Sequence, residues 1–122
     1  MPVVLIVEDE PITLSMLSEF LKDEGFQILS ASDGYAAISI LGRETVDVVL
    51  TDIGLPGALG TSIVARALKR NPVPAIVLIS GYTYNMPDSI KNHGIPVLQK
   101  PVELDLLAQT IRTQIQATRT AP

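Results

Sequence analysis

The chain has 122 residues, 47% of them apolar, and a formal net charge of -4, which predicts one domain with one core over residues 1–122. It contains no cysteine, which excludes disulfides and thiolate metal sites, and its nine Lys and Arg residues are scattered, which argues against nucleic acid as a direct partner. No apolar run approaches the ~20 residues of a membrane helix, and the N-terminus lacks the basic start of a signal peptide, so we expect a cytoplasmic protein without a membrane segment.

Apolar runs alternate with amphipathic stretches, which predicts alternating strands and helices. In chain order, we expect a strand at 3–7, a helix from Pro11 to a stop at Gly25, a strand at 26–31, a helix capped by Ser32 or Asp33 and running through Leu41, and a strand at 46–52. The second half predicts a helix from Thr61 to Arg70, a strand at 75–80, irregular structure between Gly81 and Gly94, a strand at 97–98, and a last helix through Leu104 to Ile115. Residues 118–122 are expected to fray.

Five buried strands alternating with helical patterns predict an α/β fold, a (βα)5 chain whose parallel sheet is covered on both faces. Because crossovers between parallel strands are right-handed, the carboxyl ends of all strands share one rim. That rim collects three carboxylates, one hydroxyl and one ammonium, from Glu8, Asp9, Asp52, Ser80 and Lys100. Each of these residues alone is most often a cap, a turn residue or a solvated surface group. Their convergence from four strands favours a functional site.

Four motifs, in this order along the chain, resemble the receiver domain of two-component response regulators, the CheY-like superfamily. They are Glu8-Asp9, Asp52 followed by Leu55-Pro56-Gly57, Ser80-Gly81 and Lys100-Pro101. The resemblance covers the whole chain and implies a flavodoxin-like, doubly wound three-layer sandwich with sheet order 2-1-3-4-5. It implies a phosphoacceptor signalling switch, a regulatory domain and not an enzyme in the usual sense, that dephosphorylates itself slowly.

The resemblance also assigns roles to the phosphoryl-transfer residues. Asp52 is the implied phosphoacceptor, which receives its phosphoryl group from a histidine kinase or a histidine phosphotransfer protein. The Ser80 hydroxyl would contact the phosphoryl group, and Lys100 would be its counter-charge. As in the receivers that this chain resembles, we expect the Lys100–Pro101 peptide bond to be cis.

Mg²⁺ is the implied cofactor. The resemblance gives its ligands as Glu8, Asp9, Asp52 and the backbone carbonyl of Gly54. The residue chemistry supports a metal independently, because three neighbouring carboxylates repel one another and a hard divalent cation with oxygen ligands relieves that repulsion.

The chain departs from the commonest receiver pattern at Val97, three residues before Lys100. Most receivers carry Tyr or Phe three residues before it, whereas this chain has Val97, and Gly81-Tyr82 directly follow Ser80. Because Val is short and stiff at χ1, it cannot perform the rotation of an aromatic ring. We therefore expect Ser80, Gly81 and Tyr82 to carry the switch in place of Val97.

Two alternative functions stay open. A metal-dependent phosphohydrolase that forms an aspartyl-phosphate, similar to the haloacid dehalogenase superfamily, would need an acid where this chain has Gly54, and room for a cap domain. A receiver-like interaction module working without phosphorylation would not need the complete set of phosphorylation groups. The leading hypothesis is a single-domain response regulator, a monomer or weak dimer that acts on a downstream protein target.

Overall fold

The computed structural model describes residues 1–53, 60–81 and 94–120. Four predicted features lie outside these residues: Gly54, the Leu55-Pro56-Gly57 motif, Tyr82 and the stretch expected to be irregular between Gly81 and Gly94.

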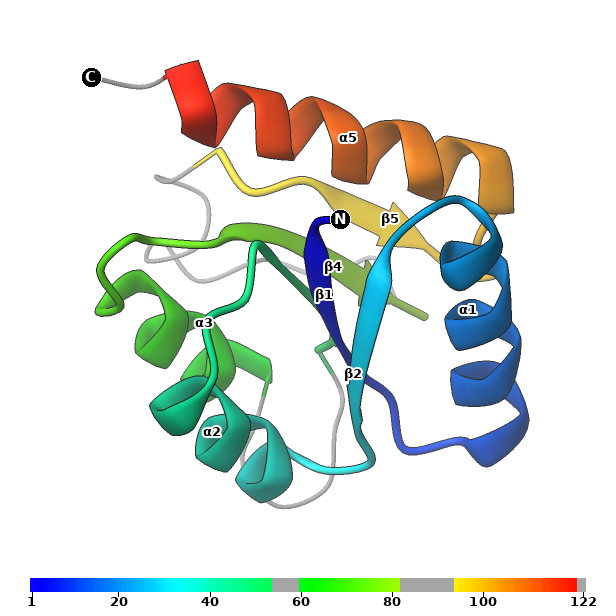
Figure 1. Cartoon of the computed structure of the whole chain (residues 1–122). Helices are drawn as coiled ribbons and strands as arrows, with labels where there is room; N and C mark the ends of the chain where they lie inside the picture. Colours follow the sequence, from blue (N-terminus) through cyan, green and yellow to red (C-terminus); the bar gives the residue numbers. More distant parts are fainter. Residues whose placement is uncertain (54–59, 82–93, 121–122) are drawn as a thin grey trace.

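Five parallel strands form one sheet in the order β2-β1-β3-β4-β5, which confirms the predicted order (Figure 1). The strands are β1 (Val3–Val7), β2 (Gln27–Ala31), β3 (Val48–Asp52), β4 (Ala75–Ser80) and β5 (Val97–Gln99). The described helices are α1 (Pro11–Asp23), α2 (Gly34–Arg43), α3 (Gly60–Leu68) and α5 (Leu104–Thr120). Helices α1 and α5 cover one face of the sheet, and α2 and α3 cover the other (Figure 1).

The continuous apolar runs of the strands follow from this three-layer arrangement. Successive side chains of a strand point to opposite faces of the sheet, so a strand covered on both faces needs apolar residues at every position. In β1, Leu5 and Val7 pack in the core beneath α2 and α3, whereas Val4 and Ile6 pack in the core beneath α1 and α5. All of β3 and β4 is buried.

Side-chain caps fix where two helices begin. The Glu10 carboxylate accepts hydrogen bonds from the backbone N–H groups of Ile12 (3.2 Å) and Thr13 (2.7 Å) at the start of α1. Asp33, and not Ser32, caps α2, because its Oδ1 accepts a hydrogen bond from the Ala36 N–H at 2.8 Å. These contacts satisfy backbone donors that have no partner within the helix.

The last helix is longer than the sequence predicts. Fraying is expected from residue 118, but α5 continues to Thr120. Buried Ile115 anchors this last part of the helix, and the Thr118 hydroxyl donates a hydrogen bond to the Ile115 carbonyl at 2.8 Å. Residues 118–120 therefore belong to the helix in this structure.

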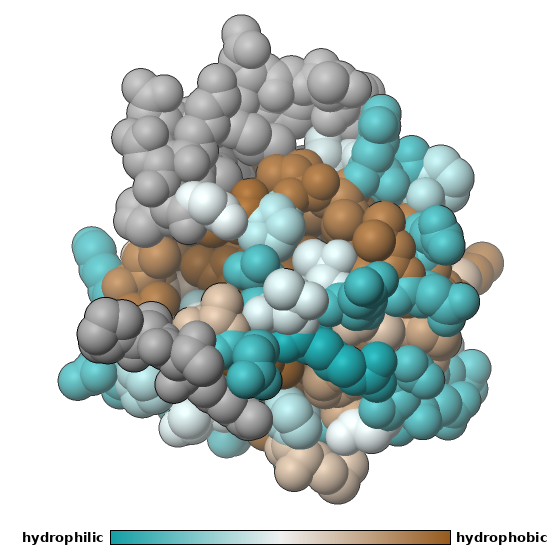
Figure 2. All heavy atoms as spheres, turned by 90° about the horizontal axis from the view of Figure 1, so that it is seen from above, coloured by the Kyte–Doolittle hydropathy of each residue, from teal (hydrophilic) through white to brown (hydrophobic). Residues whose placement is uncertain are grey.

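The face that carries α5 is seen from above in Figure 2, with polar side chains over much of it and apolar side chains gathered in one area in the upper half of the view. Two apolar residues of β5 and α5 are substantially exposed, Val97 at 40% and Leu106 at 45%. Within the described residues, no helix has both the length and the apolar character needed to cross a membrane.

Leu50, at the centre of β3, is fully buried in the core beneath α1 and α5. We expect Leu50→Ala to lower the free energy of unfolding by ~2–5 kcal/mol, because it removes packed methyl groups and leaves a cavity. Val97→Ala on the exposed edge strand is the control and should cost less than ~1 kcal/mol. Urea unfolding followed by circular dichroism measures both, and equal losses would contradict this account of the core.

Candidate functional site

The register of β1 against β3 brings the first two carboxylates together. Val7 lies opposite Thr51 in the parallel pairing, so the next residues along the two strands, Glu8 and Asp52, are neighbours. Asp52 follows Val48 and Leu50 at intervals of two, and Glu8 follows Val4 and Ile6 in the same way, so both carboxylates turn toward the face covered by α1 and α5. The alternation of side chains along each strand therefore also sets the direction in which the carboxylate at its end points.

Lys100 reaches the same rim from the end of β5. Its backbone N–H donates a hydrogen bond to the Ser80 carbonyl at 2.9 Å, which ties the start of the following loop to β4. The Lys100 ammonium donates a hydrogen bond to Asp52 Oδ2, and its Nζ lies 3.6 Å from Glu8 Oε1. One cation therefore contacts two carboxylates.

Glu8 is the least solvated carboxylate of the site. It is 1% exposed, and within the described part of the chain neither of its carboxylate oxygens has a hydrogen-bond partner. Burial raises the pKa of Glu8; the Lys100 charge lowers it by a smaller amount, and the Asp52 charge raises it further. A buried carboxylate with unpaired oxygens is costly unless a cation satisfies it.

For the pKa of Lys100, the neighbouring charges outweigh burial, whereas burial is the larger effect for Glu8. Burial works against its charged form, but the hydrogen bond and charge of Asp52, and the charge of Glu8, outweigh burial and raise the pKa of the Lys100 ammonium. Lys100 therefore remains a cation at neutral pH.

The donor set fits a hard divalent cation. One carboxylate oxygen each from Glu8, Asp9 and Asp52 lies within 4.8 Å of the others. Asp9 is exposed, whereas Glu8 and Asp52 are buried. The carboxylate group is therefore accessible to solvent on the side of Asp9, and its other two members are held by the surrounding protein. The orphaned oxygens of Glu8 are a further sign of fit, because oxygen ligands of this kind are those that Mg²⁺ prefers.

The remaining predicted residues lie at the same edge of the sheet. Ser80 ends β4 and is 2% exposed. Gly81 is exposed, and a Cβ at this position would meet no atom of the described residues within 4 Å. Val97 begins β5 with its side chain partly in solvent. The Lys100–Pro101 peptide bond, which is expected to be cis, is cis.

Sequence reasoning missed two features of α1. The first is the cap by Glu10, whose pKa is lowered by hydrogen bonds from the Thr13 backbone, the Thr13 hydroxyl and the Ile12 backbone. Its signal was an acidic residue directly before Pro11 at the start of a helical pattern.

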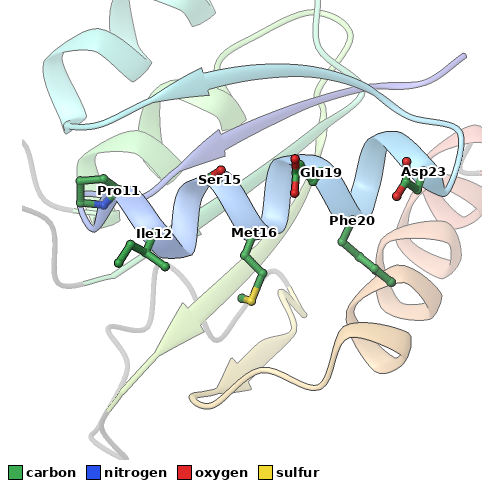
Figure 3. A pocket seen from close by; sticks show the side chains of 7 residues that line it. All are labelled: Pro11, Ile12, Ser15, Met16, Glu19, Phe20 and Asp23. Atoms are coloured by element: carbon green, nitrogen blue, oxygen red, sulfur yellow. The ribbon is translucent and has the colours of Figure 1, made fainter.

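The second missed feature is a groove of about 620 Å³ along the outer side of α1. Ile12, Met16 and Phe20 point to one side of the helix, and Ser15, Glu19 and Asp23 point to the other (Figure 3). Ile12 is 79% exposed and Met16 is 45% exposed. The sequence signal for this groove was the four-residue spacing of Ile12 and Met16. This spacing places both residues on one side of the helix, away from the face that carries the buried Leu17 and Leu21.

Comparisons with known proteins show to which family the chain belongs. The family model described as the response regulator receiver domain matches residues 4–112. A cyclic di-GMP phosphodiesterase of Thermotoga maritima is 34% identical over 85% of this chain, which spans 28% of that protein. The sensor histidine kinase RcsC of Salmonella typhimurium is 30% identical over 95% of this chain, which spans 12% of the kinase. The chain thus spans less than a third of either relative.

A solved structure carries a comparable fold with a bound metal. The response regulator TrrA of Thermotoga maritima in complex with Mg²⁺ and BeF has a TM-score of 0.82 and 25% identity, covering 93% of this chain and 99% of TrrA. Its Mg²⁺ and BeF belong to that protein.

The raised pKa of Glu8 predicts a pH dependence of stability. The folded protein holds the Glu8 proton more tightly than the unfolded chain, so stability should fall as pH rises from the ordinary pKa of 4.5 through the raised folded value. With divalent cations chelated, we expect Glu8→Gln to remove this decline and to unfold at a higher urea concentration than the wild type at about pH 7. A wild type that gains stability over this interval relative to Glu8→Gln would contradict the assignment.

Proposed function

Because this chain belongs to the response regulator receiver domain family, we propose that residues 1–122 act as one receiver domain in the cytoplasm, a phosphoacceptor switch of a two-component system. Asp52 would accept a phosphoryl group from a histidine kinase or a histidine phosphotransfer protein and lose it slowly by hydrolysis. The observation that carries the proposal is the contact of Asp52 with Lys100 beside the buried carboxylate of Glu8.

The residues of the rim divide the work of phosphoryl transfer. An Asp52 carboxylate oxygen attacks the phosphorus of a phosphohistidine, a P–O bond forms, and the P–N bond breaks with its electron pair left on the imidazole. Lys100 would balance the negative charge that arrives with the phosphoryl group, and the Ser80 hydroxyl would donate a hydrogen bond to one of its oxygens. Glu8, Asp9 and Asp52 would hold Mg²⁺, which would supply charge neutralisation at the phosphoryl oxygens.

The groove along α1 supports a protein donor over a small molecule as the natural source of phosphate. It begins at Pro11, directly after the acidic residues of the rim, so a protein seated on it has its surface beside Asp52. The exposed Ile12 and Met16 offer apolar contact, and Glu19 and Asp23 line the other side. The surface therefore suits a helix with an apolar stripe flanked by basic residues, presented by the phosphohistidine-bearing partner.

Phosphorylation itself can be tested with a small-molecule phosphodonor. We expect acetyl phosphate with Mg²⁺ to label the wild type and Asp52→Asn to take up no label, as followed by intact-mass spectrometry. Chelation should abolish labelling, because the anionic donor then approaches a cluster of like charges. Asp33→Asn, which preserves the α2 cap, is the matched control and should be labelled like the wild type. Equal labelling of Asp52→Asn would refute the proposed acceptor.

The partner surface can be tested with a phosphorylated histidine phosphotransfer protein that labels the wild type. We expect the double variant Ile12→Ser/Met16→Ser to lower kcat/KM for transfer by about tenfold, because it removes apolar area worth roughly 1–2 kcal/mol at the interface. Tyr35→Ser, which changes an exposed apolar residue on the opposite layer, is the control and should transfer normally. The ratio of transfer from protein to transfer from acetyl phosphate is the readout, and an unchanged ratio would exclude this surface.

A further inference from the structure

Arg112 of α5 contacts the end of α1 through its guanidinium group. The nitrogen Nη2 donates a hydrogen bond to the Glu24 backbone carbonyl at 3.1 Å and lies 3.3 Å from Glu24 Oε1. The centre of the same guanidinium is 5.4 Å from the centroid of the Phe26 ring. Both partners belong to the turn that joins α1 to β2, so one side chain of the last helix holds the end of the first helix.

The turn after α1 has the hydrogen bonds of a Schellman motif. Gly25 has a positive φ of 98°, and its N–H donates to the Lys22 carbonyl at 3.0 Å, while the Phe26 N–H donates to the Leu21 carbonyl at 3.1 Å. The last carbonyls of a helix have no backbone donor within the helix, and the guanidinium supplies a donor to the carbonyl of Glu24. A cation at this position also interacts favourably with the negative end of the helix dipole.

This turn adjoins one end of the groove along α1. Phe20 and Asp23 line that end of the groove, and Phe20 points toward α5 (Figure 3). Phe20 packs against the core cluster that contains Leu107 and Ile111 of α5. An opening of the last turn of α1 would therefore move two residues of the groove and change its shape.

We propose that Arg112 is a positioning residue for docking on the α1 groove. The inference rests on the proposed function, which seats the phosphohistidine-bearing partner on this groove. The 13 residues of α1 separate the turn from the rim of the sheet, a helix length of about 20 Å. Arg112 thus acts on the partner through the last turn of α1, which it holds folded with Phe20 and Asp23 in place.

Pre-organisation gives the direction of the effect. Helix ends open more readily than helix centres, and a partner that docks on an open turn must order it at the expense of binding energy. The contacts of Arg112 close the turn before the partner arrives. Their removal should therefore weaken docking and leave the chemistry at Asp52 unchanged, which corresponds to a higher KM at the same kcat.

The exposure of Arg112 separates this role from a general contribution to stability. Its side chain is 51% exposed, and ion pairs and ring contacts of solvated arginines contribute little to the stability of a whole domain. The loss of the guanidinium should therefore be felt at the end of α1 and not throughout the fold.

The first measurement is transfer from a phosphorylated histidine phosphotransfer protein, with KM and kcat determined separately. We expect Arg112→Met to raise KM roughly three- to tenfold, the loss expected when one or two side chains must be ordered on binding. Both kcat and labelling by acetyl phosphate should stay unchanged. Arg66→Met is the matched control, because Arg66 is also exposed and lies in the last turn of a helix, α3, on the other face of the sheet. Glu24→Gln, which keeps the backbone carbonyl that Arg112 binds, should transfer like the wild type.

The second measurement is amide hydrogen exchange followed by NMR. We expect the Phe26 amide, which donates back into the last turn, to exchange faster in Arg112→Met. The Leu14 amide, which donates to the Glu10 carbonyl at the start of α1, should exchange as in the wild type. Arg112→Lys keeps the charge but lacks the planar set of donors, so it should lie between the two. It replaces Arg112→Met if circular dichroism shows that the latter does not fold.

Four outcomes would overturn the inference. Three of them leave the proposed function standing: an unchanged KM in Arg112→Met, an equal rise of KM in Arg66→Met, and faster exchange at both ends of α1, which would indicate a general loss of stability. The fourth is a wild type that accepts phosphate from no donor, which would refute the proposed function and this inference together.

Discussion

The site depends on one electrostatic constraint: carboxylates from neighbouring strands converge where water is scarce. Glu8 and Asp52 are 1% and 8% exposed, and repulsion between buried like charges is far stronger than between solvated ones. The fold tolerates this pair because Lys100 contacts both. Even so, neither oxygen of Glu8 accepts a hydrogen bond from any residue that the structure describes. The pocket is therefore neutralised only in part, and it retains an attraction for further positive charge.

The sheet makes this arrangement rigid. Pairing of β1 with β3 sets Glu8 beside Asp52, and pairing of β4 with β5 sets Ser80 opposite Gln99, one residue before Lys100. A register shift of one residue would turn every side chain of a strand to the other face and would expose its apolar set. The packing of two helical layers against the sheet thus fixes the positions of the charged groups. Hydrophobic burial, the largest favourable term in folding, holds together charges that would otherwise separate.

Much of this could be predicted from the sequence because the signals are local. Aliphatic runs mark strands buried on both faces, and the residue that ends each run falls on the common rim by geometry alone. The pairing of Lys100 with Glu8 could not be predicted, because it depends on how far the lysine side chain reaches from the end of β5, past β4 and β3, toward the end of β1. The hydrogen bond from the Thr118 hydroxyl to the Ile115 carbonyl could not be predicted either, because the sequence does not show which rotamer a threonine adopts near the end of a helix. The groove along α1 could not be predicted, because the helical pattern marks the buried face of Leu17 and Leu21, whereas Ile12 and Met16 lie on the exposed face.

The buried carboxylate of Glu8 lowers the stability of the fold, but its unpaired oxygens can attract a cation. In the resting protein, an uncharged side chain of the same shape would be better suited to the pocket, since burial already favours the protonated form of Glu8. Such a replacement would satisfy the fold and remove the attraction for a cation. The stability lost at Glu8 is thus linked to the receiver chemistry, because a pocket fully neutralised by its own residues would have no affinity left for a metal or for the phosphoryl group that follows it. The actual pocket lies between an uncharged pocket and a fully neutralised one, because a single, half-exposed lysine neutralises its carboxylates only in part. A ligand can therefore still change the charge balance of the site.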